Sequence, residues 1–512
     1  MKRILPGAVA PLSALLLATC LVGGCEAAPT SSNDPSTAPQ VLRWASSSQP
    51  KSLDPRKAAS FDPMFLLEVY DPLIRRNAQG ELVPALATEW KLSADAKTLE
   101  LSLRDGVKFQ DGAPFDAQAV KANIEAAKKP GFTTTGSLAT VESVEVIDPT
   151  HVTLHMSAPR SDMLNILAGE AGMMISPKAI DSPDLERKPV GAGPFIVSTY
   201  NQSSLVYDKW DGYWDAKNIA LDQINMSFLL DEQARLRAIK SGQADAGPIR
   251  SNQKEEAKAA GLEFTEGNAA FVYGLMLNTD RSELGNPLVR QALIHAIDRD
   301  AINKAFFDGD CTPVVQPFPP DFWAHVDGLE ESPDGNYDPE KAKQLLAQAG
   351  LSGGFTMDMY MGTAPTFQSV AQAIQAQLAK VGIKVKLTAM ENTALAAARS
   401  KGEFTSSFAS IQSGRPDPSQ FIQNFYLPDG LFNPGDFSLD GVKENLQKVR
   451  EVSETADRKG PMSDIIKDVL AAGPPMIPVC SALVVWAHND KVKNLEIAVN
   501  YDYEFRSVKM ER

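Results

Sequence analysis

The sequence predicts an α/β protein with more than one lobe. Helical and strand-like segments alternate through most of the chain, which is the pattern of layered α/β folds. In the second half, an amphipathic helix lined by Val370, Ile374 and Leu378 ends at Gly382, and the alternating strand Ile383–Leu387 follows directly. The chain has 512 residues, of which 43% are hydrophobic, so about two to four domains with cores of their own are expected.

In the first half, four segments carry clear local signals. Val41–Ala45 and Leu99–Arg104 read as short strands, and Phe115–Ile124 reads as a helix with Asp116 as its N-cap. His151–His155 contains valine, threonine and leucine after Asp-Pro-Thr, which is strand composition. Four residues along a strand separate the two imidazoles by roughly 13 Å. We therefore predict that these histidines do not share a metal ion, and no metal site is expected.

The second half shows helix starts and stops more plainly. Asn286-Pro287 and Asp338-Pro339 each place a capping side chain before a proline at the first helical position. Further helices are expected over 440–454 and 465–471, the latter stopped by Pro474-Pro475. Residues 477–486 form an apolar run of strand composition.

The N-terminus predicts export. Lys2 and Arg3 precede an almost wholly apolar stretch from Ala8 to Val22, as in a secretory signal. The ending Leu-Val-Gly-Gly before Cys25 resembles a bacterial lipobox, which implies removal of residues 1–24 and lipidation of Cys25. Cys20 is the competing site, and a plain secretory signal is the alternative. Residues 25–40 are small, polar and proline-rich, so we expect a flexible tether.

The net charge bears on nucleic-acid binding, and the cysteines bear on disulfide formation. The formal net charge is −14, and a surface this acidic repels phosphate, so no nucleic-acid partner is expected. The body of the chain holds Cys311 and Cys480, which an oxidising compartment allows to pair, the alternative being two separate buried thiols.

Motifs of common enzyme classes are missing from the sequence. We find no G-x-S-x-G, H-E-x-x-H or G-K-[ST] pattern. A pair of scattered carboxylates could still serve a secreted hydrolase, and this remains the rival class. We expect no enzymatic activity and no cofactor.

Several separated blocks resemble one family, the peptide/nickel class of extracytoplasmic solute-binding proteins of ABC importers. The blocks follow one another in the family's order between about residues 41 and 505. They are Leu103–Phe115 (LRDGVKFQDGAPF), Pro189–Phe195 (PVGAGPF), Val289–Arg299 (VRQALIHAIDR), Tyr337–Leu346 and Ile374–Val385.

The resemblance implies a two-lobed periplasmic-binding-protein-like fold of type II, hinged, with the ligand in the cleft between the lobes. Lobe one would combine 41–67, 187–270 and 479–512, with 68–186 as an extra subdomain. Lobe two would span 271–478. The hinge is expected where the chain crosses near Phe271 and Val479.

The same resemblance implies where a solute is held. Peptide binders of the family hold the peptide amine with an aspartate three residues before an acidic-proline pair, a position that Gly414 occupies here. Asp417 could replace that aspartate. Arg415 instead suits a carboxylate or phosphate, unless it is a solvated turn residue. Further expected contacts are Ser60, Phe61, Asn278, Gln412 and Trp486, with Trp323 as another aromatic candidate. Ordinary packing is the alternative for Phe61 and for the two tryptophans.

These expectations describe the lipid-anchored, substrate-binding subunit of an ABC importer. The predicted partners are a small peptide or similar organic solute, the permease subunits and, through the lipid, the membrane. The chain is expected to be a monomer on the outer face of the cell membrane or in the periplasm. The alternatives are a non-peptide anionic solute, opine-like or carboxylate-rich, and the secreted hydrolase.

Overall fold

A computed structural model describes residues 39–58, 62–414, 417–428, 430–499 and 503–511. The candidates Cys25, Ser60, Phe61 and Arg415, the leader and most of the tether lie outside this part of the chain. Within it, no helix is long and apolar enough to cross a membrane.

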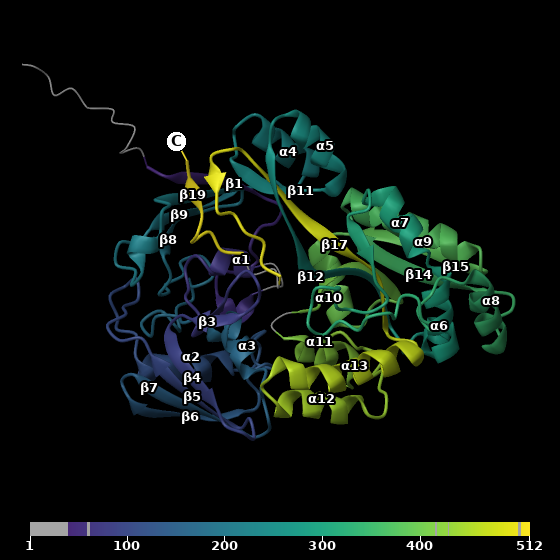
Figure 1. The fold of residues 1–512 in the computed structure, drawn as a ribbon, viewed down its shortest axis with the longest axis horizontal. Coiled ribbons are helices and arrows are strands. Elements are labelled where there is room, and N and C mark those ends of the chain that lie inside the picture. Colours follow the sequence, from purple (N-terminus) through teal and green to yellow (C-terminus); the bar gives the residue numbers. More distant parts are fainter. Residues whose placement is uncertain (1–38, 59–61, 415–416, 429, 500–502, 512) are drawn as a thin grey trace, which may run out of the picture. The chain divides into compact units, whose positions relative to one another are not determined.

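The largest sheet is mixed and links distant parts of the sequence (Figure 1). Its strand order is β15-β14-β16-β12-β17-β11-β1-β10-β9-β8, with β13 paired to β17. The strands are β1 Val41–Ser46, β8 Phe195–Tyr200, β9 Ser204–Lys209, β10 Gln223–Phe228, β11 Ala246–Ile249, β12 Glu263–Leu277, β13 Cys311–Pro313, β14 Phe355–Gly362, β15 Ile383–Met390, β16 Ser406–Gln412 and β17 Met476–His488.

A second, antiparallel sheet has the order β4-β5-β7-β6, and two short hairpin-like pairs, β2-β3 and β18-β19, stand apart from both sheets. These strands are β2 Ile74–Arg76, β3 Leu82–Pro84, β4 Ala87–Leu92, β5 Thr98–Leu103, β6 Val141–Asp148, β7 His151–Met156, β18 Val492–Lys493 and β19 Lys509–Met510. The β18-β19 pair ties the end of the described chain to the region just after β17.

Helices fill the connections between the strands. They are α1 Pro63–Leu66, α2 Ala117–Ala127, α3 Met163–Leu167, α4 Glu232–Lys240, α5 Lys254–Ala259, α6 Pro287–Ala296, α7 Arg299–Phe306, α8 Pro339–Gln348, α9 Pro365–Ala379, α10 Asn392–Ser400, α11 Pro418–Tyr426, α12 Val442–Glu451 and α13 Thr455–Ala471.

Most elements expected from local signals are confirmed. The Asp116 side chain accepts a hydrogen bond from the Ala119 amide at 2.9 Å and so caps α2. The histidines of the 151–155 segment lie in strand β7 and pair separately with acidic neighbours. The expected helix 465–471 is longer than predicted, because α13 begins at Thr455 and carries Pro461 in its interior. Glycine and proline at 460–461 are poor helix formers and hide its first turns in the sequence.

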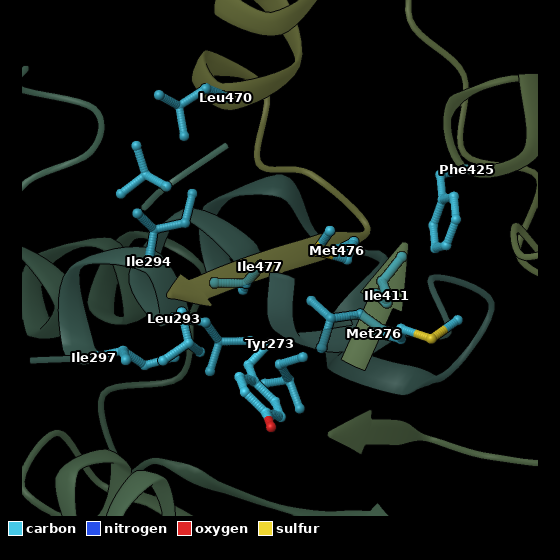
Figure 2. Packing of buried hydrophobic residues seen from close by; sticks show 14 of the residues in the cluster. Tyr273, Met276, Leu293, Ile294, Ile297, Ile411, Phe425, Leu470, Met476 and Ile477 are labelled. Atoms are coloured by element: carbon cyan, nitrogen blue, oxygen red, sulfur yellow. The ribbon is translucent and has the colours of Figure 1, made fainter. Parts of the chain in front are cut away.

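Three large hydrophobic cores form separately. The first-lobe core joins β1, β8–β10 and the C-terminal residues, and includes Trp44 and Phe505. The subdomain core lies between Leu73 and Ala192 and fills the four-stranded sheet and α2. The second-lobe core lies between Tyr273 and Ala482. Figure 2 shows side chains of that core converging from α6, β12, β16 and β17.

Two long strands, β12 and β17, run antiparallel beside each other and connect the halves of the large sheet (Figure 1). Their pairing extends from Glu263 with His488 to Met276 with Met476. The register shifts between Asn268 and Val272 and again between Tyr273 and Gly274, so the ladder is interrupted in mid-strand. β11 pairs with one end of β17, and β16 pairs with the opposite end of β12.

A disulfide fixes β13 to β17. Cys311 and Cys480 are bonded, with their Cα atoms 5.4 Å apart and a sequence separation of 169. Both side chains are buried in the second-lobe core.

Candidate functional site

The candidate solute residues of the second lobe follow strand β16. Gln412 ends the strand opposite Phe271 of β12, and the Ser413 amide donates to the Ala270 carbonyl at 3.0 Å. The Gln412 Nε2 and Ser413 Oγ atoms are buried and have no hydrogen-bond partner in the described part of the chain. A buried polar group without a partner is costly unless something else pairs with it.

Gly414 explains why the family's amine-binding aspartate is missing here. A Cβ atom at this position would lie 2.6 Å from the Ala270 Cβ and 2.8 Å from a ring atom of Phe322. Such separations are too short for a side chain, so Ala270 and Phe322 occupy the space that an aspartate would need. The structure therefore has no room for an aspartate side chain at this position.

Asp417 is fully engaged with protein groups. It is buried, and its Oδ1 atom accepts the Ser419 amide at 2.9 Å, which caps helix α11. Arg458 donates to both carboxylate oxygens at 2.6 and 2.9 Å, and the Asn165 amide donates to Oδ2 at 2.9 Å. Its role as an anchor for a solute amine stays a prediction.

Two other candidates have structural partners. The buried Asn278 side chain donates to the Gly402 and Phe404 carbonyls at 3.0 and 3.1 Å, which closes the loop before β16. Trp486 is buried in the first-lobe core, with ring centroids 5.1 Å from Trp44 and 4.3 Å from Tyr503. Both contacts are those of ordinary packing.

Trp323 lies elsewhere. Its indole faces the guanidinium of Arg458, whose Cζ is 4.7 Å from the ring centroid. This cation–π contact places Trp323 beside the residues that hold Asp417.

Around Asp417 lies a group of charged residues that sequence reasoning missed. Asp162, at the start of α3, is completely buried and binds Arg160 at 2.7 and 3.1 Å. Its Oδ2 atom also accepts Ser419 Oγ at 3.0 Å and Gln420 Nε2 at 2.7 Å. No periodicity or motif marked these residues, because they are distant in sequence and each resembles an ordinary surface residue.

The charges in this group balance one another. Burial alone would raise the pKa of Asp162, but Arg160 and Arg450 outweigh it and hold that pKa well below its usual range. Burial likewise favours a lower pKa for Arg458, yet the Asp417 carboxylate raises it above the ordinary value. The Asp162 carboxylate is therefore ionised at neutral pH.

Comparison with known proteins defines the class. Residues 81–433, more than half of the chain, match the family model described as bacterial extracellular solute-binding proteins, family 5. The chain is 32% identical over 455 residues to the glutathione-binding protein GsiB of Salmonella paratyphi A, covering 85% of this chain and 88% of that protein.

Solved structures agree on the fold. The periplasmic binding protein DppA of Helicobacter pylori, in complex with the peptide STSA, superposes with a TM-score of 0.83 at 26% identity, covering 92% of this chain and 98% of that chain. The agropinic acid complex of AgaA from A. tumefaciens R10 superposes with a TM-score of 0.82 at 25% identity, covering 92% of this chain and 99% of that chain.

The fold is thus that of the two-lobed α/β solute-binding proteins. The chain belongs to family 5 of the bacterial extracellular solute-binding proteins, whose members are the substrate-binding, non-enzymatic components of ABC importers.

Proposed function

We propose that this chain captures glutathione, or a closely similar small peptide, between its two lobes and delivers it to an ABC permease without chemically changing it. The observation that carries the proposal is the 32% identity with a glutathione-binding protein along 85% of the chain. In this proposal lobe one comprises 41–67, 187–270 and 479–512, with 68–186 as its subdomain. Lobe two comprises 271–478.

The site chemistry supports a solute of this kind. Glutathione is joined through the side-chain carboxyl of its glutamate, so its amine stands beside a free carboxylate and its net charge at neutral pH is −1. Gly414 leaves no room for the carboxylate that would hold an ordinary peptide amine. Arg415, the next residue, is a donor that fits a carboxylate. The unpaired donors Gln412 Nε2 and Ser413 Oγ would bind solute oxygens.

The hinge is proposed at the middle of β12 and β17. These strands join the two halves of the large sheet, and their ladder is interrupted between Asn268 and Gly274. A few residues with interrupted pairing can absorb the backbone change while the lobes move as rigid bodies.

Binding is tested by calorimetric titration with glutathione and with its α-linked isomer, Glu-Cys-Gly. These two tripeptides have the same composition and charge, and differ only in which glutamate carboxyl forms the peptide bond. We expect glutathione to bind and the isomer to bind at least tenfold more weakly. Equal affinities, or no binding of glutathione, would overturn the substrate assignment. Binding of an opine instead would favour the anionic, non-peptide alternative.

Arg415 provides a site-specific check. Substitution Arg415→Gln should weaken glutathione binding by roughly 10- to 100-fold, the range for loss of one charge-assisted contact to a carboxylate. Arg237→Gln is the matched control, since Arg237 lies exposed beside Asp231 at 4.0 Å. If both variants bind like the unaltered protein, Arg415 does not contact the solute.

We further propose that the protein is anchored through a lipid on Cys25. Substitution Cys25→Ala should release the protein from the membrane fraction and abolish labelling by a radioactive fatty acid. Cys20→Ala is the matched control and should leave both unchanged. Labelling that follows Cys20 would move the anchor to that residue.

A further inference from the structure

The subdomain and the second lobe meet through polar groups, although each has its own hydrophobic core. Met163, Ile166 and Leu167 of α3 belong to the subdomain core. Phe421, Ile422 and Val449 belong to the second-lobe core. Between them, residues 160–165 of the subdomain meet the helices α11 to α13 through hydrogen bonds and ion pairs. Polar contacts are typical of interfaces between parts of one chain that can move relative to one another.

The first set of contacts surrounds Asp162. Ser419 Oγ and Gln420 Nε2, both on α11, donate to one carboxylate oxygen at 3.0 and 2.7 Å. Arg450 of α12 approaches the same oxygen at 3.6 Å. Among the described residues of its own lobe, Arg160 is the charged partner of Asp162 at hydrogen-bond distance. Most of its partners are therefore supplied by the opposite lobe.

The second set involves the backbone. The Ser161 amide donates to the Arg450 carbonyl at 2.9 Å, and Ser161 Oγ donates to the Val449 carbonyl at 3.2 Å. These carbonyls belong to the last turn of α12, which has no further intrahelical partners for them. The segment 160–165 thus satisfies the C-terminal end of a helix in the other lobe.

The third set reaches the candidate solute site. Asn165 donates to Asp417, which caps α11 and lies five residues after Gln412 in sequence. Arg458 holds the same carboxylate from the side of the second lobe. The N-terminus of α11 is therefore capped by an aspartate that both lobes bind.

We propose that these residues form an interlobe latch, which closes when the lobes close and slows release of the solute. Its first half, in the subdomain, consists of Arg160, Ser161, Asp162 and Asn165. Its second half, in the second lobe, consists of Asp417, Ser419, Gln420, Arg450 and Arg458. The inference rests on the proposed capture of a solute between lobes. Asp162 acts as a positioning residue, because its hydrogen bonds to the second lobe go to Ser419 and Gln420 of α11.

The latch has a physical basis in desolvation. Asp162 and Asp417 are almost entirely buried, so their hydrogen bonds to charged and amide donors form away from water. Removing one such partner leaves a buried charge less well paired, which is more costly than loss of a surface contact. Opening would let water replace the donors that the opposite lobe supplies, so the contacts resist opening without preventing it.

The test uses Gln420→Met, which keeps the length of the side chain and removes one donor to Asp162. We expect glutathione to dissociate roughly 10-fold faster, with its association rate changed by less than about threefold, because encounter occurs in the open state. Gln447→Met is the matched control: Gln447 lies on α12 and donates only to exposed Glu451, at 2.8 Å. Asp162→Asn should show a larger effect in the same direction, roughly 10- to 100-fold.

Amide hydrogen exchange provides a second readout, in which protection of the latch is compared with protection of other strands in the same protein. In glutathione-loaded protein the Ser161 amide should be protected, and Gln420→Met should reduce that protection while β5 and β7 keep theirs. Equal dissociation rates in Gln420→Met and the unaltered protein, or a Ser161 amide that exchanges freely in the loaded protein, would overturn the latch.

Failure of the proposed substrate gives a different pattern. If glutathione does not bind the unaltered protein, the substrate assignment fails, and the exchange measurement is repeated with the peptide Ser-Thr-Ser-Ala and with agropinic acid as probes. A probe that binds and protects the Ser161 amide, with protection that Gln420→Met lowers, supports the latch. A probe that binds without protecting this amide, or with protection that the substitution leaves unchanged, overturns it.

Discussion

Two buried charge clusters in this protein use similar residues in different surroundings. One lies in the first lobe, where Arg506 pairs with Asp71 at 2.6 Å and with Glu504 at 2.8 Å, and also binds the hydroxyl of Tyr213. The other is the interlobe latch around Asp162 and Asp417. Both contain arginines and carboxylates that are largely withdrawn from water.

Their surroundings differ in one decisive way. The first-lobe cluster lies against a single hydrophobic core, to which Tyr70, Tyr213 and Phe505 belong. Its ion pairs hold the C-terminal residues against the start of the subdomain, and they can break only if that core is disrupted. The latch lies between two cores, so it can open while both remain intact. The first should therefore govern unfolding and the second should govern solute release.

The carboxylates also differ in ionisation. Burial raises the pKa of Glu68 to about 8, and the nearby Arg506 offsets only part of that rise. Asp162 is equally buried, yet its arginines hold its pKa well below the ordinary range. The number and closeness of guanidinium partners decide the outcome, because burial is the same for both.

Loss of Arg506 should have the largest effect. Arg506→Met leaves Asp71 buried without its cation, so we expect the free energy of unfolding to fall by about 3–5 kcal/mol. Chemical denaturation followed by tryptophan fluorescence measures this change. Arg237→Met, at an exposed position, should change it by less than about 0.5 kcal/mol. A loss below about 1 kcal/mol for Arg506→Met would mean that the first-lobe cluster does not control unfolding.

The disulfide should stabilise the hydrophobic core that lies between Tyr273 and Ala482, to which both of its cysteines belong. Replacing Cys311 and Cys480 together by serine should lower the free energy of unfolding by about 2–4 kcal/mol, because the bond restrains a long loop in the unfolded chain. Glutathione dissociation should change by less than about threefold, unlike the effect of the latch substitutions. Reductant is the control: it should destabilise the unaltered protein to the level of the variant and leave the variant unchanged. A large change in dissociation rate would place the bond in the closing motion.

The two halves of the latch should be energetically coupled in binding but not in folding. Asp162→Asn, Gln420→Met and the double variant form a thermodynamic cycle. We expect a coupling of about 1–2 kcal/mol in glutathione binding, because both changes remove the same contact. In the stability of solute-free protein the coupling should stay below about 0.5 kcal/mol. Comparable coupling in both measurements would show that the contact is part of the fold and does not open.

Glu68 should give the smallest effect, and one that depends on pH. A carboxyl whose folded-state pKa is raised stays protonated in the fold while the unfolded chain ionises, so its contribution to stability is present below about pH 4 and declines as pH rises towards 8. Glu68→Gln should thus raise stability at pH 9 by about 1–2 kcal/mol and change it little at pH 4. Glu125→Gln, exposed near Lys121 at 3.8 Å, is the control and should show no such dependence.

The contribution of Asp162 in the latch depends on pH in the opposite direction to that of Glu68. A depressed pKa means that the contribution of Asp162 is present above about pH 4 and is lost only as pH falls below the ordinary range. Glutathione dissociation should therefore be almost constant between pH 5 and 8. A marked change within that interval would indicate that a different group controls opening.

The sequence predicted local structure where a few neighbouring residues decide it. The caps Asp116, Asn286 and Asp338 mark helix starts that the structure contains, because a side-chain oxygen and a nearby amide are sufficient for a cap. The long strand β12 was not predicted, since it contains Gly267, Gly274 and polar residues that weaken the alternating pattern. Its pairing with β17 comes from tertiary packing.

The candidate site was predicted only in part. The segment from Gln412 to Asp417 follows the family resemblance, and the structure gives it unpaired donors and a buried cap. The reason for Gly414 lies in Ala270 and Phe322, which are more than 90 residues away along the chain and could not be connected to it by any local pattern.

By itself, the sequence determined the α/β class, the family and the helix caps, because short-range periodicity, capping and motif order express them. Only the tertiary structure decided which charges meet. Asp162 and Ser419 are separated by 257 positions, and Asp417 and Arg458 by 41, yet each pair forms one buried contact. Electrostatic pairing depends on distance in space and on exclusion of water, and neither quantity is encoded in the local order of residues.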